Sequence, residues 1–332
     1  MDRQQLSANF ETNGLDEDGT IVLSLDTKSG SGSARLGGIA HSFATRRLSR
    51  VVTSALPDFD LTAGTARLTG RLTLRDWEPT AGILSTKLAG VAGFSSSIVF
   101  TGVATDVDLE YDASAGLRAQ PATVSVDLVD IGVALTDLTA RYLLHLPELS
   151  VDVSELQLAA FGGTAHIEPF SLGAEASSQT VLVTLDSLDL AELLAVKDFA
   201  AIELAGRVNG RIPVTLGADG VRIEDGRIDG VAPGGVIRYQ QSSPDSGSTA
   251  TGMGIAAKAL SNFEYETLAS DVNYLENGDL VLQMQIRGRN PDLEGGRPIV
   301  LNLGVENNIP EMLRSLQATR NIQDILERQV NR

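Results

Sequence analysis

The chain contains no cysteine, and this absence removes several chemistries at once. Thiol nucleophiles, cysteine-ligated zinc and disulfide bonds all require the missing side chain. The absence does not distinguish a reducing compartment from an oxidising one. With 332 residues the chain is long enough to bury a full core, and its length alone allows one or two domains.

Basic residues are also scarce in this chain. It has 26 Lys and Arg against 43 Asp and Glu, a formal net charge of −17, and only four of the basic residues are lysine. Proteins that bind DNA or RNA neutralise phosphates with clustered basic side chains, and no basic patch is visible in the sequence. Nucleic acid is therefore excluded as a partner.

The sequence has no long hydrophobic run. The longest uncharged stretch, residues 88–105, is diluted with Gly, Ser and Thr and alternates like a strand, so it does not predict a membrane span. The first residues, MDRQQLSANFETNG, lack the basic and apolar regions of a signal peptide.

Aromatic side chains make up 5% of the sequence, and Trp77 is the single tryptophan. Sugar-binding sites usually stack their ligand on aromatic rings, so this shortage argues against a carbohydrate ligand. A hydrocarbon chain needs only aliphatic surface, which the sequence has in abundance.

Motifs of catalysis and metal binding are missing as well. No nucleophile elbow, Walker loop or zincin motif occurs, and the three histidines are isolated from one another. Asp106 and Asp108 lie two residues apart on one predicted strand, a spacing that glycoside hydrolysis could use. We favour a solvated outer face opposite Val107 and Leu109. The sequence therefore predicts no enzyme, no metal and no cofactor.

Strand patterns are what the sequence has most of. Apolar and polar residues alternate with a period of two along most of the chain, which gives each strand one apolar and one polar face. Eight residues that alternate cleanly with polar neighbours are expected to share an apolar concave face. They are Val99, Val103, Val107, Val126, Val151, Val183, Leu282 and Met284.

Turn and helix patterns are fewer. Four dipeptides suit tight turns, namely Asn209-Gly210, Asp219-Gly220, Asp225-Gly226 and Asp229-Gly230. Gly226, Gly234 and Gly235 are expected to act as structural turn or bulge positions. Helical spacing predicts three helices, at residues 46–56, 188–196 and 309–330, of which the last is amphipathic.

Strand after strand with short turns predicts a mainly β fold, built as one elongated antiparallel sheet that curls on itself. Such a sheet forms an open groove with an apolar concave face and a polar convex face. A few short helices and the C-terminal amphipathic helix complete it. We expect one continuous domain over residues 1–332.

Two stretches carry a resemblance to a known family. The first is IELAGRVNGRIPVTLGADGVRIEDGRIDGVAPGGVIRY at 202–239, and the second is GRNPDLEGGRPIVLNLGVENNIPEMLRSLQ at 288–317. Together they resemble the C-terminal region of the YdbH proteins, AsmA-like relatives of TamB, most specifically over residues 186–320. The resemblance implies an open, taco-shaped β-groove (a β-taco) that conducts phospholipids between the inner and outer membranes without catalysis. The region has also been labelled a dicarboxylate transport domain, but a dianion needs clustered basic side chains.

The resemblance also implies a location and a partner. Relatives lie in the periplasm of diderm bacteria with an inner-membrane anchor far upstream, so this chain would be a C-terminal fragment of a longer protein. A small outer-membrane lipoprotein would add strands at the C-terminal edge, along residues 298–304. Ile299, Leu301 and Leu303 share one face of that predicted strand.

Two alternatives remain open at this stage. A structural or adhesive β-solenoid would show the same alternation, but its apolar face would be a closed core with no lipid cargo. An enzyme acting on an acidic or glycan substrate would instead depend on Asp106.

Overall fold

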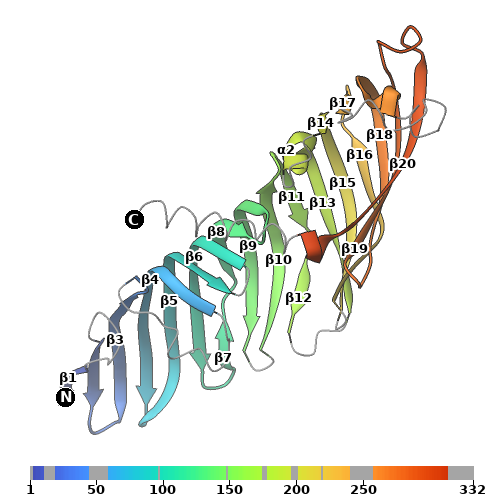
Figure 1. Cartoon of the computed structure of the whole chain (residues 1–332). Coiled ribbons are helices and arrows are strands. Elements are labelled where there is room, and N and C mark those ends of the chain that lie inside the picture. The colour runs from blue at the N-terminus through green and yellow to red at the C-terminus, as the bar shows by residue number, and fades with distance from the viewer. Residues whose placement is uncertain are drawn as a thin grey trace, which may run out of the picture. The chain divides into compact units, whose positions relative to one another are not determined.

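The computed structural model describes residues 3–10, 19–44, 59–95, 98–146, 149–173, 178–195, 201–217, 220–239 and 257–312. The described residues confirm a mainly β fold, an antiparallel sheet that does not close into a barrel (Figure 1). Contacts divide the chain into two compact units. Unit 1 comprises residues 1–156 and 169–176, and unit 2 comprises residues 157–168 and 177–332. The expectation of one continuous domain stays a prediction.

Unit 1 is built from long strands that pair with their neighbours in sequence. The strands are β1 (Arg3–Phe10), β2 (Gly19–Asp26), β3 (Ser31–Ser42), β4 (Phe59–Arg75), β5 (Glu78–Ser95), β6 (Ile98–Asp112), β7 (Gly116–Ala119), β8 (Ala122–Asp130), β9 (Ala134–His145), the first part of β10 (Ser150–Ala160) and β12 (Phe170–Leu172). The ladder runs from β1 to β6 in order, β6 pairs with both β7 and β8, and β8 pairs with β9.

A series of bulges crosses the middle strands of unit 1. The registers of β4 with β5 and of β5 with β6 each shift where a glycine has positive φ, at Gly64 (97°), Gly90 (60°) and Gly102 (71°). The register of β3 with β4 also shifts, between Leu36 and Ile39. Bulges bend a strand and increase its twist, so a series of them bends this part of the sheet.

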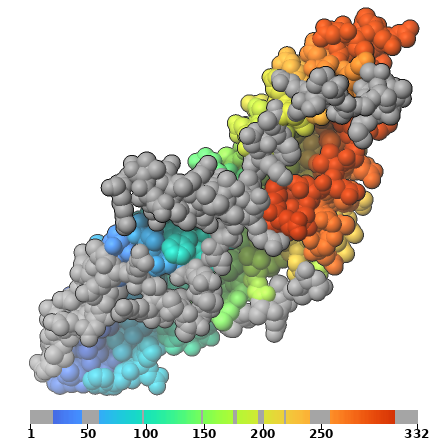
Figure 2. All heavy atoms as spheres, viewed as in Figure 1, coloured from blue at the N-terminus to red at the C-terminus, as the bar shows by residue number. Residues whose placement is uncertain are grey.

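Unit 2 contains the remaining elements. They are the end of β10, then β11 (Gly163–Ile167), β13 (Gln179–Asp189), α2 (Leu190–Ala195), β14 (Ile202–Ala205), β15 (Arg207–Gly217), β16 (Gly220–Gly230), β17 (Gly235–Tyr239), β18 (Phe263–Tyr274), β19 (Asp279–Arg289) and β20 (Pro298–Asn308). Figure 2 shows the last strands of this unit, β18 to β20, in orange and red.

Two long strands of unit 2 are each interrupted by a bulge, because β14 runs on into β15 and β16 runs on into β17 along the same ladder. β13 pairs with β15, and α2 and β14 lie between them in sequence. β16 pairs with β18, whereas β17 pairs with β14 and with the start of β18. Leu190 and Leu193 of α2 and Leu260 of the short helix at residues 257–260 pack against a buried core. The core is made of Leu188, Val208, Ile237, Phe263, Tyr265, Leu268 and Ile286.

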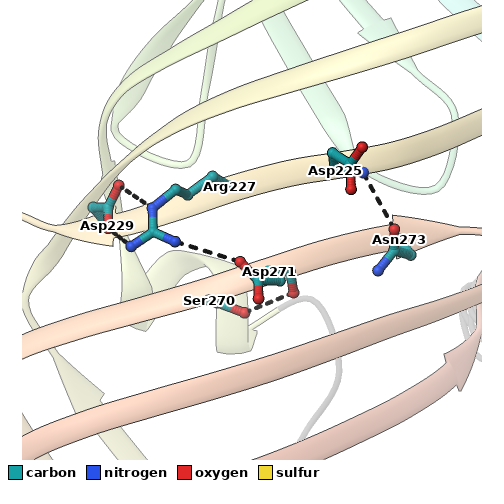
Figure 3. Close-up of polar contacts among 6 residues, drawn as sticks. All are labelled: Asp225, Arg227, Asp229, Ser270, Asp271 and Asn273. Atoms are coloured by element: carbon teal, nitrogen blue, oxygen red, sulfur yellow. Dashed lines mark hydrogen bonds and ion pairs between the residues drawn. The ribbon is translucent and has the colours of Figure 1, made fainter.

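Side-chain bonds fix the long-range pairing of β16 with β18 (Figure 3). Arg227 on β16 binds Asp229 Oδ1 at 3.1 Å and Asp271 Oδ1 of β18 at 3.4 Å. Asn273 Oδ1 accepts a hydrogen bond from the backbone N–H of Asp225, at 3.3 Å. These contacts flank the register shift between Ile223 and Gly226, where the main-chain ladder is interrupted.

The predicted turn dipeptides are wrong at three of the four positions. Asn209-Gly210 lies inside β15, and Asp225-Gly226 and Asp229-Gly230 lie inside β16. At Gly210 a β-carbon would lie 2.9 Å from Leu185 Cδ1, so this glycine makes room for a side chain of β13. At the fourth position, Gly217 pairs with Gly220 to close the β15–β16 hairpin, and Asp219 lies outside the described residues.

The predicted helices have mixed outcomes. The helix expected at 188–196 is confirmed as α2, residues 190–195. Residues 309–312 are helical, and Asn308 Oδ1 caps them by accepting the backbone N–H of Glu311 at 3.0 Å. The helix expected at 46–56 and the rest of the C-terminal helix lie outside the described residues.

Candidate functional site

The strand register places one apolar face across the middle of unit 1. Directly opposed residues of an antiparallel pair project from the same face of the sheet. One row of register partners runs from Leu36 on β3 through Gly70, Leu84 and Leu109 to Ala119 on β7. This row is apolar throughout.

The apolar face of unit 1 is hollowed rather than filled. A hollow of about 300 Å³ opens on it, and its lining is almost entirely apolar. The lining includes Ile21, Leu36, Leu72, Leu84, Leu109 and Leu117. Gly70 and Gly82 make room for leucines of the neighbouring strands, since a β-carbon at Gly70 would lie 3.2 Å from Leu84 Cδ1 and one at Gly82 would lie 2.9 Å from Leu72 Cδ1.

Large apolar side chains at this hollow remain exposed. Ile21 is 39% exposed and Leu117 is 48% exposed. Apolar surface gathered in a hollow and left in contact with water is typical of a binding site. We call this surface the unit 1 apolar face.

Three of the predicted residues in unit 1 lie on strand faces continuous with this surface. Val107 is opposite Thr86, and Val103 is opposite the buried Val91. Val126, which is buried, is opposite Leu138.

Val99 and Val151 lie differently. Val99 is 47% exposed, and the bulge at Gly102 separates it from Val103, because β6 changes register with β5 between the two. Val151 pairs with Leu172 of β12 and alternates with Asp152, whose side chain faces the polar side of β9.

The opposite face of the same strands is polar. Asp106 is exposed and pairs with Lys87 Nζ at 3.1 Å, and Asp108 is opposite Ser85. Alternation along β6 puts Asp106 and Asp108 on the face opposite Val107. The solvated interpretation of these carboxylates fits their position.

One polar cluster on unit 1 joins three strands. His145 Nε2 lies 2.7 Å from Asp152 Oδ2, and Ser171 Oγ donates to Asp152 Oδ1 at 2.6 Å. The bond from Ser171, and then the bond to His145, hold the pKa of Asp152 below its usual value. Ser171 and His145 both bind the carboxylate of Asp152, so the cluster links β9, β10 and β12. It does not have the serine–histidine hydrogen bond of an activated nucleophile.

Unit 2 has its own apolar face, in two parts. On one part Val183 is opposite Ile212 and Ile167. On the other, Leu282 is opposite Val272 and Val305. Met284 pairs with Leu303, Ile286 with Leu301 and Gly288 with Ile299, so the predicted C-terminal residues share this face.

Two short helices cover one end of the unit 2 face, because Leu190 and Leu193 of α2 and Leu260 pack against its buried core. Met284, Ile299, Leu301 and Leu303 border the same core. Val305, on the same face nearer the end of β20, is 42% exposed. The unit 2 face is therefore closed at one end and more open at the other.

Other kinds of site are not found in the described part of the chain. No group of three or more His, Asp and Glu residues there is placed to hold a metal ion. None of the described helices is long and apolar enough to cross a membrane.

An open antiparallel sheet with a hollowed apolar face is the arrangement expected of a lipid conduit, and the family comparison agrees. The profile of the YdbH-like family, described as "Intermembrane phospholipid transport protein YdbH", matches residues 18–331. The chain belongs to the YdbH-like family. Membership implies transport of phospholipid between membranes by a periplasmic, envelope-spanning protein, and the family is not one of enzymes. No curated protein matches this YdbH-like chain, and no solved structure does.

Two features of the site were missed in the sequence. The bulges at Gly64, Gly90 and Gly102 had a signal, since an isolated glycine inside an alternating strand often marks a bulge. The short helix at residues 257–260, whose Leu260 packs against the core of unit 2, had none, because four residues are too few for a helical period.

Proposed function

We propose that the apolar faces of this YdbH-like chain shield the acyl chains of phospholipids while their headgroups stay in water. The hollow on the unit 1 apolar face carries this proposal, since it is open and lined almost entirely by aliphatic side chains. A closed β-solenoid would have filled that space with its own side chains.

Energetics support a groove without catalytic groups. Each CH₂ of an acyl chain exposed to water costs about 0.8 kcal/mol, so a lipid with two chains faces a large barrier to leaving a bilayer. An apolar surface along the path lowers that barrier by replacing water around the chains. Val103, Val107, Val126, Val151, Val183, Leu282 and Met284 are the proposed lining together with the hollow, and Val99 contacts lipid beyond the bulge.

The lipid pathway needs a connection to a membrane at each end, and the free edge of β20 is a candidate for one of them. β20 pairs with β19, and its other edge has no partner among the described strands. An exposed edge accepts an added strand through its unpaired main-chain groups. We assign this edge, with Ile299, Leu301 and Leu303, to a small outer-membrane lipoprotein, and an inner-membrane anchor to an upstream part of the full-length protein.

A charge placed in the hollow tests the lipid proposal. Leu84→Asp puts a carboxylate on the unit 1 apolar face, whereas the matched variant Ser85→Asp puts it on the polar face one residue away. We expect the phospholipid recovered with purified Leu84→Asp, measured by mass spectrometry of the extract, to fall severalfold, because a buried charge opposes the bound chain. Ser85→Asp should match the unmodified protein. If both variants melt normally and carry equal lipid, the face is not the lipid site.

A further inference from the structure

The polar face of unit 1 brings two arginines together. Arg35 on β3 and Arg71 on β4 are direct register partners, and both are exposed. Directly opposed residues have their β-carbons roughly 5 Å apart, and like charges in that position destabilise a sheet. The sheet thus carries an unfavourable pair in a chain whose net charge is −17.

Neither guanidinium has a carboxylate partner within the described ranges. Six other arginines there do pair with carboxylates, namely Arg141, Arg222, Arg227, Arg238, Arg289 and Arg297. Arg211 and Arg227 are another directly opposed pair, and there Arg227 binds Asp229 and Asp271, which supply the counter-charge that Arg35 and Arg71 lack.

The register also shows what surrounds the pair. Ser33 and Thr73 are partners in the adjacent row, so their hydroxyl groups flank the two arginines. Val22 is opposite Arg35 on β2, and Ile83 is opposite Arg71 on β5. These neighbours are hydroxyl donors and aliphatic groups, with no carboxylate among them.

We propose that Arg35 and Arg71 form a binding site for a phosphate-type oxyanion. Two guanidinium forks can each donate two hydrogen bonds to phosphate oxygens, and a bound dianion removes the repulsion between them. A surface hollow of about 400 Å³ beside Arg71 leaves room for a group attached to the phosphate, and Thr73 and Arg118 line it together with two carboxylates. The carboxylates, Glu110 and Asp112, accept hydrogen bonds from Gln120 and Ser114.

This site is separate from the acyl-chain site, because the sheet lies between the two. Arg35 and Arg71 alternate with Leu36 and Leu72, so their side chains project from the face opposite the leucines, and the two arginine positions border the edge of the apolar hollow. The oxyanion is therefore either a free phosphate or the phosphate of a headgroup on a bilayer that the polar face meets.

Thermal unfolding in phosphate and in chloride of equal ionic strength tests the site. Phosphate stabilises many proteins by exclusion from their surface, so the readout is the difference between the unmodified protein and the variants. We expect Arg35→Gln and Arg71→Gln to lose the additional stabilisation by phosphate, with binding weakened about tenfold per lost guanidinium. Both should fold normally in chloride, since each relieves a repulsion.

Arg287→Gln is the matched control. Arg287 is an exposed arginine of unit 2 that is opposite Val300 and Thr267, so its loss removes the same charge without touching an arginine pair. Arg287→Gln should keep the full effect of phosphate.

Sedimentation with vesicles distinguishes the two sources. The probes are vesicles of phosphatidylcholine alone and of phosphatidylcholine with phosphatidylglycerol. Phosphate-dependent stabilisation without vesicle binding supports a free oxyanion, and vesicle binding that Arg35→Gln abolishes supports a headgroup. The same phosphate effect in the unmodified protein and both variants, with equal vesicle binding, would overturn the site. Both measurements are independent of the lipid recovered with Leu84→Asp, so the oxyanion site and the acyl-chain site can fail separately.

Discussion

Tyr265 shows how tightly single residues are fitted in the core of unit 2. Its hydroxyl donates to the backbone carbonyl of Ala205 at 3.2 Å, and burial raises its pKa above the usual value. Gly234, with a φ of 103°, and Gly235 lie against the same two residues. A β-carbon at Gly235 would collide with the carbonyl oxygen of Ala205, and one at Gly234 with that of Tyr265.

Replacing either glycine should therefore destabilise the fold. We expect Gly234→Val and Gly235→Val to lower the free energy of unfolding by on the order of 1–3 kcal/mol, measured by urea denaturation. Gly304→Val on β20 is the control, because a β-carbon there meets no atom within 4 Å. Unchanged melting with lost lipid recovery would mean that the glycines serve binding rather than folding.

Asp152 makes the stability of the fold depend on pH. Its pKa is lowered in the folded state by Ser171 and then by His145, so it stabilises the fold when ionised. That contribution is present above the unfolded pKa of about 3.9 and is lost as the pH falls through the lower folded value.

Urea denaturation between about pH 6 and pH 2 measures this contribution. We expect Asp152→Asn to reduce stability above about pH 4 and to flatten its decline below, by a small amount because the carboxylate is half-exposed. Ser171→Ala should do part of the same, since the hydroxyl is the larger cause of the shift. If the stability of Asp152→Asn depends on pH as that of the unmodified protein does, the bonds of Asp152 to Ser171 and His145 do not stabilise unit 1.

At the scale of elements, period-two alternation predicted the strands well because each strand keeps one apolar face. The four turn dipeptides were weaker evidence, since three of them lie inside strands. Gly210 is required by the side chain of Leu185 and Gly226 lies at a bulge, and neither role differs from a turn in the local sequence. Packing against neighbouring strands therefore determines whether such a glycine forms a turn or lies inside a strand.

The edge of β20 is the element whose role is most open to test. A lipoprotein that adds a strand there should approach residues 299–304 within disulfide distance. We expect cysteines at Val300 and Asn302 to crosslink with cysteines in the lipoprotein, detected on a non-reducing gel, because both lie on β20 and their side chains project from the same face beside the strand that would be added. Cysteines at Ile21 and Leu23 on β2 are the control positions. Crosslinks that form only on β2 would reverse the proposed polarity.

At the scale of the molecule, the sequence predicted the fold class and the family, and the structure locates where the apolar surface is open. Alternation assigns residues to a face but does not reveal what covers that face. In unit 2, Leu190 and Leu193 of α2 cover one end of the apolar face, whereas the unit 1 apolar face keeps an open hollow. These differences depend on how elements distant in sequence pack together, which no local pattern encodes.

Photo-crosslinking in cells tests the central claim, that the apolar face of this YdbH-like chain contacts phospholipid along its length. A photoreactive residue is placed at Val107 on the apolar face or at Asp106, its neighbour on the polar face. Captured phospholipid is then identified by mass spectrometry. We expect capture at Val107 and none at Asp106, because only the apolar face replaces water around acyl chains. Equal capture at both positions, or capture at Asp106 alone, would contradict a lipid-bearing groove.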